Sequence, residues 1–229
     1  MSKFVVGIDP SPTCAFLGFF HQGKAVRGVP VPLGSPEADE RNVRGASRRA
    51  HASAEAVVAR VLQEGKPDMV VMSKLLLQDI TKDPSGARRA ALWWEIVRQF
   101  DEMGVPIAEM PPMAAQSFMG MKQDKDKAFT GNVGGKTHLG GYGFKLTKTR
   151  VMDTWRKPDG APLKDNPEFR YSTIAMAAAG GMVMGWDVGL EPSDARLRVL
   201  TSKACDFPDE FPLSLSESTW NRNREMTEV

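Results

Sequence analysis

The order of apolar segments in residues 3–110 most constrains what this chain can fold into. Three apolar and β-branched runs come first, FVVGI (4–8), CAFLGFF (14–20) and KAVRGVPVPL (24–33). Turn residues separate them, which predicts short antiparallel strands. Between 35 and 110 two helical patterns alternate with two buried-type strands. Since parallel strands are joined by helical crossovers, this order predicts an α/β fold, a mixed sheet with helices on both faces.

Boundary signals place the elements of this region and of the rest of the chain. Helices are expected at 35–67, which starts with Ser-Pro, and at 85–104, and strands at 68–72 and 105–110. Residues 120–142 are rich in Gly and Lys and predict an inserted loop. Further helices are expected at KTRVMDTW (148–155) and within 167–186. We therefore predict one domain over 1–186 and a C-terminal extension over 187–229 that is partly disordered.

Composition excludes several classes of protein. The 229 residues carry a net charge of only +2, so any nucleic-acid binding must come from local clusters. Cys14 and Cys205 are far apart, which gives no support to a thiolate zinc site and favours a reducing compartment. No apolar run approaches the ~20 residues of a membrane span, and a cytoplasmic protein is expected. GNVGGKTH (131–138) lacks the spacing of a P-loop.

Asp9 ends the first strand, and Pro10 and Pro12 fix the turn that follows. In most proteins an aspartate at such a place binds backbone amides of its own turn. The alternative is that Asp9 is a metal ligand.

Five stretches favour the metal-ligand alternative by their order: GIDPSPTCAFLGF, KPDMVVMSK, SGARRAALWWEIVRQFDEMGVPIAEMPPMAAQSFMG, GFKLTKTRV and STIAMAAAGG. Together they resemble the RuvC group of the RNase H-like superfamily, which contains Holliday junction resolvases, including compact bacteriophage types. The resemblance covers residues 3–185 apart from 120–142. It implies an RNase H-like sheet and Mg²⁺-dependent cleavage of DNA, in which acids hold two metal ions.

The sequence departs from the family at most of its acidic positions. The family takes acids from the first strand, the end of the central strand and an i,i+3 pair that opens the last helix. Asp9 matches the first, but Ser73, Phe169 and Ser172 stand at the other three, and Lys74 follows Ser73. Since Mg²⁺ needs carboxylate charge, we expect weak or absent Mg²⁺ binding at Asp9. Whether the chain is an enzyme stays open.

Relocated acids are an alternative. Asp165 and Glu168 are spaced i,i+3 and lie one turn before Ser172, so they could replace the lost pair if the helix begins early. Asp79 could reach back from the loop after the central strand. Equally, Asp165 and Glu168 could simply favour the positive end of a helix. Glu109 is expected to have a supporting or structural role.

Basic residues cluster on the predicted helices and in the inserted loop. They predict sequence-independent contacts with DNA phosphates, although interleaved acids also suit an ordinary solvated face. Lys148 matches a basic position of the family, whereas Gln116 stands where the family has another lysine. The candidate DNA-binding residues are Arg48, Arg49, Arg88, Arg89, Lys136, Lys145, Lys148 and Arg150.

Three functional hypotheses follow. The first is a RuvC-like protein that binds branched DNA and has lost nuclease activity or retains little. A second is an active Mg²⁺-dependent junction endonuclease with relocated acids. The third is a pseudo-nuclease that serves as a structural or protein-interaction subunit through its C-terminal tail. The resemblance also implies a homodimer through the helix that carries Trp93 and Trp94, one of which we expect at an interface.

Overall fold

The structure is a computed structural model that describes residues 3–35, 37, 42–75, 85–120, 132–133, 136–137, 139–166, 169–211, 213–214 and 216–221. Its strands are β1 (Phe4–Ser11), β2 (Cys14–His21), β3 (Val26–Pro32), β4 (Met69–Ser73), β5 (Ile107–Met110), β6 (Asn132–Val133) and β7 (Lys136–Thr137). Its helices are α1 (Val43–Leu62), α2 (Gly86–Glu102), α3 (Pro112–Phe118), α4 (Leu139–Thr154), α5 (Ser172–Val183) and α6 (Asp194–Leu200).

A five-stranded sheet in the order β3-β2-β1-β4-β5 forms the centre of the molecule. β1 pairs antiparallel with β2, and β2 pairs antiparallel with β3. β1 pairs parallel with β4, and β4 pairs parallel with β5, across the crossovers that α1 and α2 provide. The predicted mixed α/β sheet with a parallel part is therefore confirmed.

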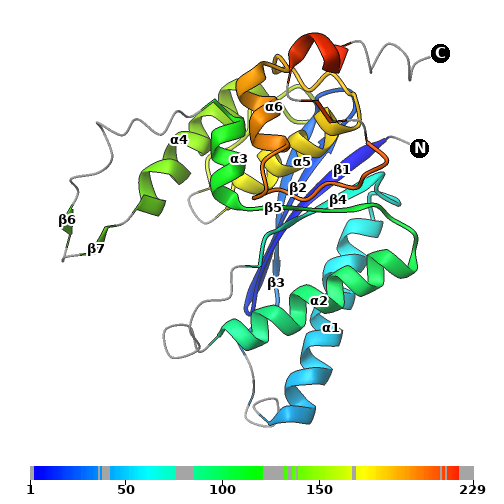
Figure 1. The fold of residues 1–229 in the computed structure, drawn as a ribbon. Helices are drawn as coiled ribbons and strands as arrows, with labels where there is room; N and C mark the ends of the chain where they lie inside the picture. Colours follow the sequence, from blue (N-terminus) through cyan, green and yellow to red (C-terminus); the bar gives the residue numbers. More distant parts are fainter. Residues whose placement is uncertain are drawn as a thin grey trace.

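The two faces of the sheet bury separate apolar clusters (Figure 1). Residues of α1 and α2, among them Val57, Trp93 and Ile96, pack on one face. The other face is covered by α5, whose residues are all buried, with α3 and α6 beside it. α5 lies directly on the strands because β1 and β2 offer Gly7 and Gly18. A Cβ at these positions would lie 2.1 Å from the Thr173 oxygen and 2.3 Å from the Ile174 nitrogen.

Helix starts differ from the sequence-based expectation. α1 begins at Val43, because the Asn42 side chain accepts a hydrogen bond from the Gly45 amide at 2.8 Å and caps the helix there. α4 begins at Leu139, inside the segment expected to be a loop, and is longer than the helix expected at 148–155. α5 begins at Ser172. The chain before it is held out of helix, since the Tyr171 hydroxyl donates to the Lys164 oxygen and accepts from the Asn166 amide.

Both outer strands of the sheet are covered by later segments of the chain. Val26, at the start of β3, donates its amide to the Arg156 oxygen at 2.9 Å. On β5, Glu109 and Asp206 exchange two backbone hydrogen bonds of 2.7 and 2.9 Å. Each of these contacts is a single β-bridge, so it occupies one position at the edge of the sheet. Within the described part of the chain, no helix is long and apolar enough to cross a membrane.

Candidate functional site

The carboxyl ends of β1, β4 and β5 meet at one edge of the sheet. The parallel register pairs Ile8 with Met72, so it brings Asp9 opposite Ser73 at the next step. Side chains alternate along a strand, and Asp9 and Ser73 fall on the face that α5 covers, together with Val5 and Met69. Both are almost completely buried, at 6% and 7% exposure. The first-strand and central-strand positions of the resemblance therefore come together.

Lys74 and Glu109 lie on the opposite face of the sheet, where their neighbours Met72 and Ile107 pack against α1 and α2. The Lys74 ammonium donates to the Ala204 oxygen at 3.1 Å. Burial raises the pKa of Glu109 above its ordinary value. By this alternation neither side chain is directed to the face of Asp9.

Arg170 neutralises Asp9. Its Nη1 atom lies 2.5 Å from Asp9 Oδ2, and its guanidinium carbon lies 4.9 Å from the centre of the Phe16 ring. Phe16 is the residue directly opposite Asp9 on β2. The guanidinium is thus held by a carboxylate and an aromatic face from adjacent strands. The sequence-based argument missed Arg170, although its place between Phe169 and Ser172, two positions that lack the family's acids, was a signal.

Phe169 and Ser172 are uncharged residues on this side of the site. The Phe169 ring packs edge-on against Phe16, with their centres 6.1 Å apart. Ser172 is fully buried as the first residue of α5. Its hydroxyl makes no hydrogen bond with any described residue. Two of the positions that carry acids in the family therefore hold an aromatic ring and a neutral hydroxyl.

Asp165 lies before α5, not on its first turn, so the early helix start that the relocated-acid hypothesis needs is absent. Both carboxylate oxygens of Asp165 lie 2.7 Å from the ammonium of Lys148 on α4. The predicted relocated ligand and the predicted DNA-binding lysine are thus bound to each other. Asp79 and Glu168 lie outside the described residues.

The donors at Asp9 do not fit a Mg²⁺ ion. Among the described residues of the site, the oxygen donors are the Asp9 carboxylate and the Ser73 and Ser172 hydroxyls, and a guanidinium already binds the carboxylate. Mg²⁺ gives up its water reluctantly and is normally held by carboxylates. Across the described ranges of the chain, no group of three His, Cys, Asp or Glu residues is placed to hold a metal ion.

The predicted DNA-binding residues fall into two groups. Arg49 donates to the Leu33 and Gly34 oxygens at 2.8 Å, and Arg150 donates to the Met119 oxygen at 2.8 Å, so both tie segments of the chain together. Arg48 on α1 and Arg88 on α2 are exposed, and Arg89 is half-buried. The side chains of Lys136 and Lys145 lie outside the described part.

The exposed arginines are at the same edge of the sheet as Asp9. Arg49 reaches the end of β3, which places the first turns of α1 there. The Trp93 indole donates to the Ser73 oxygen at 2.8 Å, so the turns of α2 before Trp93 extend past the end of β4. Helix N-termini carry partial positive charge, which adds to that of the arginines. This edge can therefore attract an anion, although its own carboxylate is neutralised.

Comparison with known proteins relates this geometry to one solved fold. No protein-family model and no curated protein matches the chain. Among solved structures, Thermus thermophilus RuvC in complex with a Holliday junction substrate is 18% identical, with a TM-score of 0.51 over 80% of this chain and 96% of that one. A second Thermus thermophilus RuvC structure is 17% identical, with a TM-score of 0.50 over 80% of this chain and 97% of that one. The chain has the RuvC fold. The predicted RNase H-like sheet of this fold is confirmed, and Asp9 lies at the edge where its parallel strands end.

Proposed function

We propose that this chain is a RuvC-fold protein that binds branched DNA and that has lost nuclease activity or retains very little. The observation that carries the proposal is the ion pair of 2.5 Å between Arg170 and Asp9. Asp9 stands where the resolvases that this chain resembles have a metal-binding carboxylate. Here the positive charge beside that carboxylate comes from an arginine of the protein itself.

A guanidinium can neutralise Asp9, but it cannot replace a metal ion in phosphodiester cleavage. A divalent ion lowers the pKa of a bound water and stabilises the leaving oxygen. A guanidinium has no site for a water ligand. Ser73 and Phe169 add no negative charge that would favour a metal ion over the guanidinium. Binding without efficient cleavage follows.

DNA binding is supported by the arginines at this edge. Arg48 and Arg88 extend from the N-terminal turns of two helices on one face, where they can contact phosphates on neighbouring strands. The Holliday junction bound by the Thermus thermophilus RuvC of the same fold suggests a branched substrate for this chain too.

A homodimer is part of the proposal and is supported by Trp94. Its side chain is 60% exposed on α2, while Trp93 beside it is buried. A large exposed aromatic side chain is a common anchor of protein interfaces. A two-fold dimer would suit a junction whose strands are related by near symmetry.

The test uses a labelled four-way junction and a matched linear duplex, each with Mg²⁺, Mn²⁺ or EDTA. We expect the junction to bind more tightly than the duplex, without cleavage by the wild type or by Asp9→Asn. Metal-dependent cleavage that Asp9→Asn abolishes would overturn the proposed loss of activity. Absence of binding to both DNAs would favour a protein-interaction subunit instead.

The Lys148–Asp165 pair separates binding from relocated catalysis in the same assay. Asp165→Asn leaves Lys148 free to meet a phosphate, so junction binding should tighten, whereas Lys148→Ala should weaken it. If Asp165 were a relocated catalytic acid, Asp165→Asn would instead abolish a cleavage activity of the wild type.

A further inference from the structure

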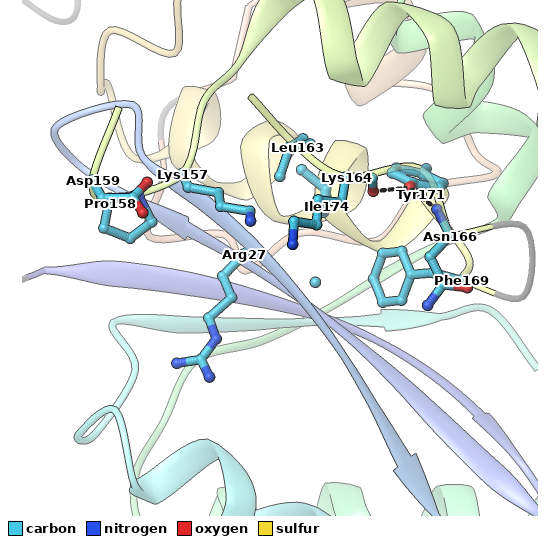
Figure 2. Close-up of a pocket in the computed structure, with 11 residues that line it drawn as sticks. Arg27, Lys157, Pro158, Asp159, Leu163, Lys164, Asn166, Phe169, Tyr171 and Ile174 are labelled. Atoms are coloured by element: carbon cyan, nitrogen blue, oxygen red, sulfur yellow. Dashed lines mark hydrogen bonds between the residues drawn. The ribbon is translucent and has the colours of Figure 1, made fainter. Parts of the chain in front are cut away.

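A cavity of about 510 Å³ lies between the outer strand β3 and the connection from α4 to α5 (Figure 2). This volume is in the range of small-molecule sites. The cavity lies beside β3, which is separated from β1 by β2 in the sheet. Neither the proposed DNA-binding edge nor the Arg170–Asp9 pair uses it.

The floor and one wall of the cavity are apolar. Phe169 and Leu163, each 8% exposed, line it above the fully buried Ile174. The Phe169 ring lies directly on β3 because residue 28 is glycine, and a Cβ there would come within 2.5 Å of the ring. Tyr171 packs edge-on against Phe169, with ring centres 5.2 Å apart. The hydrogen bonds of its hydroxyl to Lys164 and Asn166 hold the rim in place, so the apolar surface is formed in advance.

Two lysines supply positive charge. Figure 2 shows the side chains of Lys157 and Lys164 extending into the space between the loop and β3. Neither forms an ion pair with another residue of the described ranges. Arg27 is different, because its guanidinium turns away and binds Glu64 at 2.7 Å. The acid at the rim, Asp159, accepts a hydrogen bond from the Ala161 amide at 3.0 Å in its own turn.

We propose that this cavity binds a deoxynucleotide, with its phosphate between Lys157 and Lys164 and its base against Phe169. Ammonium groups bind phosphate as point charges, and a base gains stabilisation from contact with an aromatic ring. The nucleotide has two possible sources, a free mononucleotide or the phosphorylated end of a DNA strand. The second source rests on the proposed function, whereas the first does not.

The cavity is connected to the neutralised carboxylate through one step of the chain. Phe169 faces the cavity and the next residue, Arg170, binds Asp9. A ligand that packs on Phe169 therefore contacts the segment that holds the guanidinium in place.

The test is fluorescence anisotropy of the full chain with a 5′-phosphorylated dithymidylate that carries a 3′ fluorophore. Thymidine 5′-monophosphate, thymidine and inorganic phosphate serve as competitors. We expect the monophosphate to compete at least about tenfold better than either of its parts, because only it engages both the lysines and the apolar wall. Competition by inorganic phosphate alone at the same concentration would overturn the assignment of a nucleotide.

Variants locate the binding. Lys157→Ala/Lys164→Ala should weaken dithymidylate binding by about tenfold or more, since two charge-assisted contacts are lost. Lys3→Ala/Lys203→Ala removes the same charge from exposed residues outside the cavity and should leave binding unchanged. Thermal unfolding checks that both variants fold. Equal affinities of the two variants would overturn the proposed site.

The same competition experiment distinguishes the two sources of the nucleotide. If free thymidine 5′-monophosphate binds as tightly as the dithymidylate, the ligand is a free mononucleotide. If the monophosphate competes at least tenfold more weakly than the dithymidylate binds, the ligand is the end of a DNA strand. Binding of the four-way junction is measured separately on the same protein and tests the proposed function alone. A wild type that binds the junction but no mononucleotide or dithymidylate refutes the cavity assignment alone. The reverse result refutes only the proposed junction binding.

Discussion

Asp9 is a nearly buried carboxylate that forms an ion pair with Arg170. In Arg170→Ala the carboxylate keeps its burial and loses both its ion pair and the cation that stacks on Phe16. We expect the free energy of unfolding to fall by roughly 1–3 kcal/mol, the usual cost of an unpaired buried polar group. We also expect millimolar Mn²⁺ to raise the Tm of this variant, because the carboxylate becomes available to a cation. Thermal unfolding with and without Mn²⁺ measures both effects.

The controls for this prediction are the wild type and Asp9→Asn/Arg170→Ala. Neither should gain stability from Mn²⁺, since one keeps its guanidinium and the other lacks the carboxylate. An equal Mn²⁺ effect in all three proteins would contradict the idea that Arg170 takes the place of a cation.

Glu109 makes the stability of the protein depend on pH. Burial raises the pKa of Glu109 above its ordinary value of 4.5, so the folded state holds its proton at pH values where the unfolded state has released it. Stability from this group is therefore lost as pH rises above that ordinary value. We expect Glu109→Gln to be more stable than the wild type at pH 7, with the difference shrinking toward pH 4. Urea unfolding at several pH values measures it. The same substitution at exposed Glu210 should show no such trend, and a pH-independent effect at Glu109 would contradict the prediction.

The sequence could reveal single candidate residues but not their partners. Lys148 and Asp165 were both singled out, one as a cation for DNA and the other as a metal ligand. They are 17 residues apart on different segments, and only the fold brings them to 2.7 Å. Arg170 was missed for the same reason, because its partner Asp9 lies 161 residues away. Local patterns contain no information on pairs at such separations.

The helices α1 and α2 each bury one apolar face and carry exposed arginines in their N-terminal turns. If Arg48 and Arg88 each contact a phosphate, Arg48→Ala/Arg88→Ala should reduce the slope of log affinity against log salt concentration by about 2. Titrations of the four-way junction at several salt concentrations measure the slope.

The matched control is Arg98→Ala on α2. Its guanidinium is bound to Glu95 and Glu102 on the same helix, so its charge is already neutralised. We expect no change in slope for this variant. An equal loss in both variants would mean that overall charge, and not the edge of the sheet, determines DNA binding.

Elements differ in how far the sequence determines them. β2 and β4 were predicted within one residue, since continuous apolar runs leave few alternatives, whereas β1 continues three residues past its predicted apolar run. The start of α1 was predicted at Ser35, but Asn42 caps the helix instead, because Ser-Pro and Asn are both acceptable start signals. The segment before α5 is fixed by contacts of Phe169 with distant Phe16 and Gly28 and by hydrogen bonds of the Tyr171 hydroxyl to Lys164 and Asn166, which no local pattern reveals.

On the scale of the whole molecule, the C-terminal extension belongs to the main apolar core. Val188, Leu197, Leu200, Phe207 and Trp220 are buried in the same cluster as α5. The backbone of Asp206 pairs with Glu109 on β5. The sequence suggested a partly disordered extension because proline and acids alternate with short apolar groups there. The spacing of those apolar groups is irregular, but each reaches a position on the surface of α3, α5 or β5.

We therefore expect a chain that ends at Trp186 to lose its stability, even though it retains every strand of the sheet. Each large apolar side chain of the extension contributes about 1.5–3 kcal/mol by burial. Five such side chains together approach the ~5–15 kcal/mol that stabilises a typical domain. Circular dichroism and thermal unfolding of the truncated protein should show no cooperative transition. A chain that ends at Asn221 keeps all five side chains and should unfold like the full protein. If the shorter chain unfolded at the same Tm as the full one, residues 1–186 would be an independent domain, and the packing of the extension on α5 would be incidental to the fold.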